Sequence, residues 1–172
     1  MDTTVSSVLS AIPNLILRTP LRKLLSALAD RNSSRMLSTA GLVIKAGGGV
    51  LAKTGAAACH LVVDGQLATI GAAIDMPALS GTVTNAKFNV FVFYQDSAGV
   101  RTTVMGTEAA TLGAVKFPDT PVKKAMIGFI VINPTGAGNF VGNTTALDDA
   151  GVVPNAVFLS VLSGADPNML LG

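Results

Sequence analysis

Cys59 and His60 are the only cysteine and the only histidine in this chain of 172 residues. A thiol beside an imidazole is a pair that nucleophilic catalysis uses, because the imidazole can accept the thiol proton. Both residues lie in the apolar run 59–63, which has the pattern of a strand, and neighbouring residues of a strand point to opposite faces. We therefore predict that the two side chains do not meet and that Cys59 is a small buried residue. Zinc bound by the usual nitrogen and sulfur ligands is excluded, because such sites need more of these ligands.

The carboxylates could serve two other kinds of site. Calcium takes oxygen ligands, and the candidates for such a site are Asp148 and Asp149 with Asp119 or Asp96. Their spacing is not that of an EF-hand loop, so we expect them to cap turns. Paired carboxylates that cleave a glycoside stay open, with Glu108 as the only glutamate. No tryptophan and one tyrosine would supply few rings for a sugar-stacking groove. The sequence thus predicts a protein that is not an enzyme and has no metal or cofactor.

Residues 47–49 are three consecutive glycines, a composition that phosphate-binding loops share. The lysine and hydroxyl residue of such a loop do not follow at the required spacing, and no helical pattern begins after it. We predict instead a hairpin turn between strands at residues 42–45 and 50–53.

From about residue 40 onward, short apolar runs alternate with Gly, Asn, Asp and Pro, which is typical of strands joined by turns. Asp64 and Gly65 lie between two such runs and predict a two-residue type I′ hairpin. Gly128, in the middle of the apolar run 125–132, indicates a β-bulge or a tight crossing over an aromatic ring. Because no helical segments lie between the runs, we predict a mainly β fold, an antiparallel β-sandwich or barrel.

Residues 88–94 form a strand that is apolar on both faces, so both faces must be covered. Either the strand is central in a two-layer body, or a second subunit covers one face. The predicted residues of the oligomer core or interface are Phe88, Val90, Phe91, Val92, Phe93, Tyr94, Phe129 and Val131.

The composition favours association. Hydrophobic residues make up 49% of the chain and charged residues 13%, whereas about 25% charged residues is typical. So few charges cover a monomer thinly, and burial between subunits is the simplest remedy. The alternative is that abundant alanine and glycine raise the mean hydropathy. The longest apolar stretches are about seven residues, against the ~20 of a membrane helix, so we expect no membrane partner. The net charge of +2 is too small to indicate nucleic-acid binding by the whole chain.

The chain divides into a helical N-terminal arm, residues 1–38, and a β domain, residues 39–172. A first helix is indicated by apolar residues at helical spacing, followed by a proline: Val5, Val8, Leu9, Ile12 and Pro13. A second helix is predicted to begin with Thr19 at its N-cap and Pro20 at its first position, and to end at residues 32–34.

The second helix combines a stripe of leucines with basic residues. Its predicted contact residues are Arg18, Leu21, Arg22, Leu24, Leu25, Leu28, Arg31 and Arg35. Only one acidic residue, Asp30, opposes the basic ones in this segment. Two interpretations stay open: a solvated helix face, or an arm that docks on an acidic partner surface. Contact with a membrane surface or nucleic acid is less favoured, because the helix is short and has no interleaved aromatic residue.

Four stretches resemble small virion proteins of tailed bacteriophages, and they are residues 40–47, 87–99, 127–136 and 139–148. The resemblance covers most of residues 40–160. It implies a decoration, cement or head-fibre component, of a class that is commonly a trimeric β-fold seated on the capsid surface of the virion. Such a protein is made in the host cytoplasm, and its partners are further copies of itself and the major capsid protein. We therefore expect an oligomer, a trimer by the resemblance, whose arm contacts the major capsid protein. The alternative is a tail, fibre or baseplate module that binds a receptor or a glycan.

Overall fold

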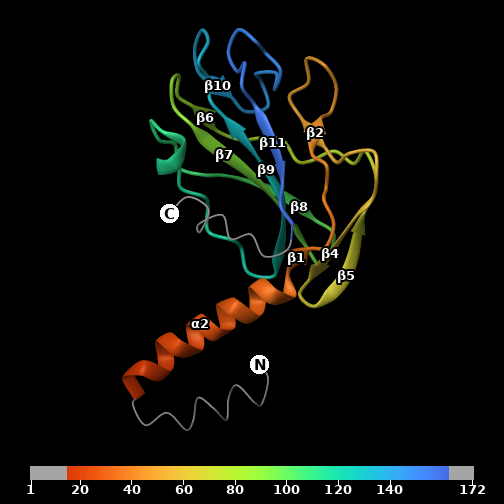
Figure 1. Cartoon of the computed structure of the whole chain (residues 1–172), viewed down its shortest axis with the longest axis vertical. Helices are drawn as coiled ribbons and strands as arrows, with labels where there is room; N and C mark the ends of the chain where they lie inside the picture. The colour runs from red at the N-terminus through yellow and green to blue at the C-terminus, as the bar shows by residue number, and fades with distance from the viewer. Residues whose placement is uncertain (1–14, 163–172) are drawn as a thin grey trace.

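Figure 1 shows the computed structural model of the chain, which describes residues 15–162. The first predicted helix, with Val5, Val8, Leu9 and Ile12, lies outside the described residues. The described chain is one long helix followed by short strands in antiparallel sheets. The prediction of a mainly β fold with an N-terminal helix is thereby confirmed.

Helix α2 (Leu15–Ser33) begins earlier than predicted. Pro20, expected at the first helical position, lies inside the helix. Proline has no N–H to donate to the carbonyl one turn earlier, so this arrangement costs the helix one internal hydrogen bond. Four of the five helical residues before it, two leucines, an isoleucine and an arginine, tolerate a helix well, and the helix continues through them and through Thr19. Its end at Ser33 agrees with the predicted end.

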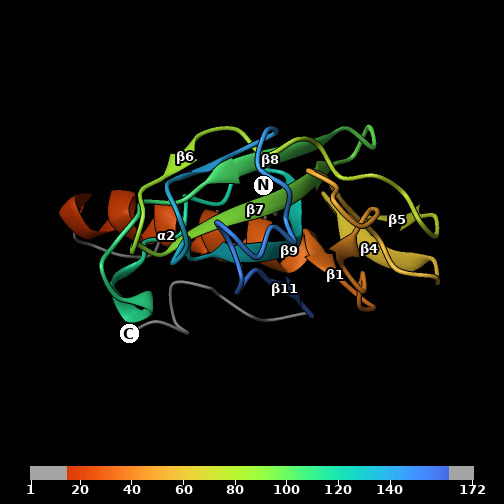
Figure 2. The same ribbon diagram turned by 90° about the horizontal axis from the view of Figure 1, so that it is seen from above.

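The largest sheet has four antiparallel strands in the order β11-β9-β7-β8. The bounds are Val157–Ser160 for β11, Lys124–Ile132 for β9, Asn89–Asp96 for β7 and Arg101–Met105 for β8. The two fully apolar runs form the two inner strands, which are the strands with cover on both faces. Figure 2 shows β8 at one margin of this sheet and β11 at the other.

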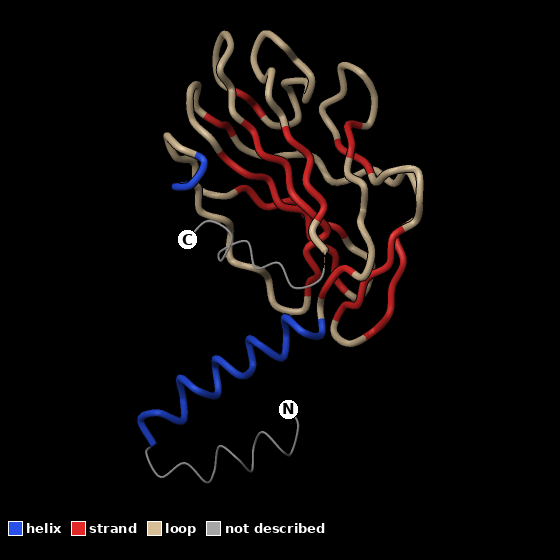
Figure 3. Tube along the Cα trace, viewed as in Figure 1, coloured by secondary structure: helices blue, strands red, loops and turns tan. Residues whose placement is uncertain are grey.

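Three smaller sheets complete the body, and Figure 3 shows how much loop connects them. One has the order β1-β4-β5, and two consist of the pairs β2-β3 and β6-β10. Their bounds are Arg35–Met36 (β1), Val43–Ile44 (β2), Ala52–Lys53 (β3), Cys59–Val63 (β4), Gln66–Ile70 (β5), Thr82–Val83 (β6) and Phe140–Val141 (β10). A 3-10 turn, η1, spans Leu112–Ala114.

The turn geometry confirms the hairpin at Asp64 and Gly65. Their φ angles are 51° and 78°, and a type I′ turn needs positive φ at both positions. The turn joins β4 to β5, with Val63 paired to Gln66. The glycine turn at residues 47–49 joins β2 to β3, as predicted.

Gly128 lies beside a β-bulge, which confirms one of its two predicted roles. The pairing of β7 with β9 shifts register just after Phe93, which is the partner of Gly128. The close neighbour of Gly128 is not an aromatic ring. A Cβ at this position would overlap the carbonyl oxygen of Leu159 in β11 and the side chain of Leu42. Glycine therefore lets β11 lie tightly against β9.

Two hydrophobic clusters lie on the two faces of the four-stranded sheet. The larger one fills the space between this sheet and the β1-β4-β5 sheet, and Phe91 and Leu61 belong to it. The smaller one, on the other face, contains Val92 and Tyr94. Because side chains alternate along a strand, β7 contributes to both clusters.

Candidate interaction surfaces

The strand predicted to form the oligomer core is covered on both faces by its own chain. Seven of the eight predicted residues are buried and Phe88 is half-buried; the buried ones are Val90, Phe91, Val92, Phe93, Tyr94, Phe129 and Val131. Of the two alternatives drawn from the sequence, the structure has the first, a central strand in a two-layer body. Seven of these side chains are buried within their own chain and so present little surface to a second subunit, and their assignment to a subunit interface stays a prediction.

The cover on the second face comes from the segment that follows β8. Val115 and Phe117 pack in the smaller cluster, and the ring of Phe117 meets the ring of Phe129 edge to face with centroids 4.9 Å apart. Burial raises the pKa of Tyr94 to about 12, so its phenol stays neutral. The Tyr94 hydroxyl has no well-aligned hydrogen-bond partner within residues 15–162, although the nearby Thr120 side chain moderates the pKa rise. This face is therefore packed as core.

The C-terminal end of α2 is held by the β4–β5 hairpin. The N–H of Gly65 donates to the Ser33 carbonyl at 2.8 Å. The N–H of Asp64 donates to Ser34 Oγ at 3.0 Å, and the Asp64 carboxylate forms an ion pair with Lys123, also at 3.0 Å. The hairpin thus satisfies a carbonyl at the end of the helix that would otherwise lack a partner. From this base, α2 projects away from the β body (Figure 1).

The leucine stripe of α2, defined as Leu21, Leu24, Leu25 and Leu28, is incompletely covered. Leu24 is 57% exposed and Leu28 is 47% exposed, whereas Leu21 and Leu25 are half-buried. Arg22 and Lys23 are exposed beside it. The side chains of Arg18 and Arg31 lie outside the described part of the chain.

Arg35 does not belong to the helix. It is an exposed residue of β1, and the next residue, Met36, is a core residue with 1% exposure. The arm as a projecting element therefore ends at Ser34, four residues before the predicted boundary at 38.

Strand β11 presents an exposed apolar row that sequence reasoning missed. The β11 row, defined as Val157, Leu159 and Val161, lies on the face of the smaller cluster, and Val157 and Leu159 are 47% and 40% exposed. The apolar runs after residue 40 were predicted to form strands, but the position of this strand at the margin of the sheet was not predicted. A signal was present in the sequence, since residues 150–162 carry no charged side chain.

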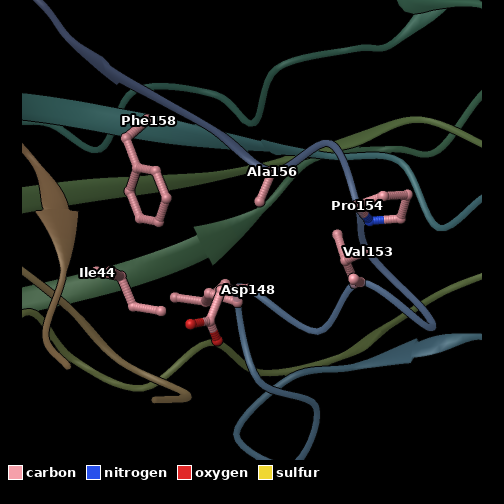
Figure 4. A pocket seen from close by; sticks show the side chains of 8 residues that line it. Ile44, Asp148, Val153, Pro154, Ala156 and Phe158 are labelled. Atoms are coloured by element: carbon pink, nitrogen blue, oxygen red, sulfur yellow. The ribbon is translucent and has the colours of Figure 1, made fainter. Parts of the chain in front are cut away.

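The opposite face of β11 borders an open pocket of about 270 Å³. Figure 4 shows Phe158 of β11 and the preceding Ala156 on one side of it, with Ile44 and Asp148 across from them. Both carboxylate oxygens of Asp148 accept the N–H of Gly48 at 3.0 Å. The pocket is mainly apolar and contains a single ring, so it offers little for stacking a sugar.

Cys59 and His60 point apart, as predicted. Cys59 is fully buried, and burial raises the pKa of its thiol. His60 is exposed, with Nδ1 at 3.0 Å from the hydroxyl of Thr69 on β5. A buried neutral thiol without a base beside it is a packing residue.

Glu108 joins two loops. It accepts hydrogen bonds from Lys87 Nζ at 2.8 Å and from the N–H and hydroxyl of Thr84, both at 2.9 Å. The bond from Lys87, followed by that from the Thr84 backbone, lowers the pKa of Glu108 to about 2. These hydrogen bonds and the lowered pKa are typical of a carboxylate in a structural ion pair.

Two of the four aspartates considered for calcium, Asp96 and Asp149, cap turns. Asp96 accepts the N–H groups of Ala98 and Val100, and Asp149 accepts that of Gly151. In the part of the chain that the structure describes, no three His, Cys, Asp or Glu side chains gather as a metal site would require.

Comparison with known proteins gave no match: no family model fits the sequence, and no curated protein or solved structure matches it significantly. No helix within residues 15–162 is both long enough and apolar enough to cross a membrane.

Proposed function

We propose that the chain is a structural protein of a bacteriophage virion, which decorates or cements the capsid as an oligomer. Helix α2 is its docking element, and the major capsid protein is its partner. One observation carries the proposal: α2 is held at its base, projects from the β body, and leaves Leu24 and Leu28 exposed. A helix with an apolar stripe on one face normally buries that stripe against another surface.

The charges of α2 define the kind of surface that it fits. Arg22 and Lys23 are exposed beside the leucine stripe, and the first turn has no acidic residue. Two such helices side by side would bring like charges together, which is unfavourable. An acidic surface with an apolar groove satisfies both the stripe and the basic residues. The partner of α2 is therefore a different protein, in agreement with the capsid contact that the resemblance implies.

The experiment measures binding to purified capsids that lack the protein, with the double variant Leu24→Glu/Leu28→Glu. Fully burying one leucine contributes about 1.5–3 kcal/mol, and docking can bury only the exposed half of each of these two side chains, so the double variant should bind at least about tenfold more weakly. Both residues are exposed, so the fold should persist. The matched control is Val141→Glu, a 40% exposed residue of β10 at the end of the body far from α2 (Figure 1), and it should bind like the parent chain.

Deleting the whole of α2 tests its docking role more completely than the double variant does. The deletion should remove residues 1–33 and stop there, because β1 belongs to the body. The shortened chain should keep its oligomeric mass and lose capsid binding. Undiminished binding by both the deletion and the double variant would refute the docking role. Specific recognition on a glycan array, with no capsid binding by the parent chain, would favour the receptor- or glycan-binding alternative.

A further inference from the structure

We propose that β11 is a self-association edge, through which two copies of the chain pair antiparallel and join their four-stranded sheets into one. The inference rests on the proposed function for the premise that the chain assembles, and it does not involve α2. Three features of β11 carry it: the direction of its backbone groups, the exposed β11 row and the absence of charge.

No strand in the described part of the chain covers the outward backbone groups of β11. The N–H of Val161 donates to the Ile127 carbonyl in β9. Because backbone groups of antiparallel strands alternate in direction, the N–H and C=O of Phe158 and Ser160 point away from β9. Within residues 15–162 no strand pairs with this outer side, and β11 ends the sheet (Figure 2).

When two β11 strands pair antiparallel, the side chains of one strand fit those of the other. Pairing Phe158 of one copy with Ser160 of the second places the two-fold axis at Leu159. Leu159 then faces its own counterpart, and Val157 faces Val161 of the second copy. The two β11 rows merge into one apolar band beside Phe129 and Val131, which already pair with Leu159 and Val157 within each chain. Burying such cross-strand apolar pairs stabilises a sheet.

The lack of charge on β11 indicates that the strand that pairs with it comes from a second copy of the chain. Edge strands of monomeric proteins are commonly protected by lysine, proline or a bulge, and residues 155–162 contain neither lysine nor proline. The surface that fits must be equally uncharged and must offer free backbone groups at the same spacing. A second β11 meets both conditions by symmetry, whereas the basic helix α2 meets neither.

The pairing is isologous and has two-fold symmetry. The resemblance implies a trimer instead, so the stoichiometry distinguishes the two. The parent chain should show a mass of twice 17.4 kDa, or an even multiple of it, by light scattering at about 50 µM.

A cysteine cross-link tests the register. Leu159→Cys places two thiols opposite each other across the axis, at a non-hydrogen-bonded pair whose Cα atoms are about 4.5 Å apart, which suits a disulfide. Oxidised glutathione should convert this variant to a covalent dimer at least ten times faster than Leu67→Cys, the more exposed control on β5. Cys59 is fully buried, so the parent chain should not cross-link. Val157→Cys should cross-link slowly alone and rapidly when combined with Val161→Cys.

Opposite results overturn the inference. Cross-linking of Leu159→Cys no faster than that of Leu67→Cys excludes the pairing, and so does a monomeric or threefold mass for the parent chain. A monomer would mean that another segment of the same chain covers β11. Leu159→Lys should lose the dimer mass while Val122→Lys, at a more exposed position, keeps it. Capsid binding is measured separately, so failure of the β11 pairing and failure of α2 docking are distinguishable.

Discussion

The leucine stripe of α2 and the β11 row are apolar surfaces of similar exposure, but they differ in the charge around them. Leu28 on α2 and Val157 on β11 are each 47% exposed. Arg22 and Lys23 stand beside the stripe, whereas residues 150–162 carry no charge. Apolar area alone would mark both as interaction sites without distinguishing their partners. Charge distinguishes them, because basic residues beside the stripe disfavour contact with a second copy of α2, whereas the row has no such charges in residues 150–162.

The two surfaces also differ in how firmly they are held. Strand β11 lies along β9 over its full length, with Gly128 allowing close contact. Helix α2 is held at its C-terminal end by the hairpin. A surface that is fixed before binding loses less entropy on binding. The row is thus suited to a permanent contact between copies, and the stripe to a contact formed when the protein reaches its partner.

The largest effect should follow from Gly128→Ala, which disturbs β11 without touching α2. The added Cβ overlaps the Leu159 carbonyl oxygen, so β11 must move away from β9. We expect a loss of about 3 kcal/mol in the free energy of unfolding, measured by chemical denaturation. Dimerisation should fall as well, while the folded fraction should still bind capsids through α2.

Gly113→Ala is the matched control for that substitution. A Cβ at residue 113 would meet nothing within 4 Å, and we expect a change within about 0.5 kcal/mol. If Gly128→Ala were as mild as Gly113→Ala, the close contact between β9 and β11 would not hold the row in place.

The second largest effect should come from salt, which should weaken binding through α2 but not binding through β11. Raising sodium chloride from about 50 mM to about 500 mM shortens the range of charge interactions. Capsid binding through Arg22 and Lys23 should weaken by about tenfold, as measured by co-sedimentation with capsids. The dimer, which has an uncharged interface, should keep its dissociation constant in sedimentation experiments. A dimer that dissociates in salt would contradict the uncharged β11 interface.

Acid should act on the body through Glu108 and leave the uncharged β11 row unaffected. The folded state holds the pKa of Glu108 at about 2, below its ordinary value of 4.5. The unfolded state therefore binds the proton first, and the stability that Glu108 contributes is full above pH 4.5 and is lost as the pH falls toward 2. Glu108→Gln should reduce this fall in thermal stability between pH 5 and pH 2. Loss of the dimer in that range without unfolding would reveal a titrating group at β11.

Sequence reasoning was sufficient where neighbouring residues decide the outcome. The hairpin at Asp64 and Gly65, the burial of Cys59 and the bulge beside Gly128 all follow from local steric rules. It was insufficient where distant segments decide. No residue near Tyr94 in the sequence indicates that residues 115–117 cover the face of the sheet on which Tyr94 lies. The choice between a second layer of the same chain and a second subunit therefore stayed open. The marginal position of β11 likewise depends on strand order, which local patterns do not encode.

The smallest effect should come from Ser34→Ala, at the base of α2. The substitution removes the hydroxyl that accepts the Asp64 N–H but leaves the bond from Gly65 to Ser33. One such bond contributes about 1 kcal/mol or less, so the fold should hold while amides in the last turn of α2 exchange hydrogen several-fold faster. Ser38→Ala is the matched control, because Ser38 Oγ accepts the N–H of His60 in the body. Its loss should lower stability by a similar amount without changing exchange in α2. Equal exchange in the two variants would show that the bond from Asp64 to Ser34 does not hold the end of the helix, and the contrast between a firmly seated row and an arm held at one end would then rest on the bond from Gly65 to Ser33 alone.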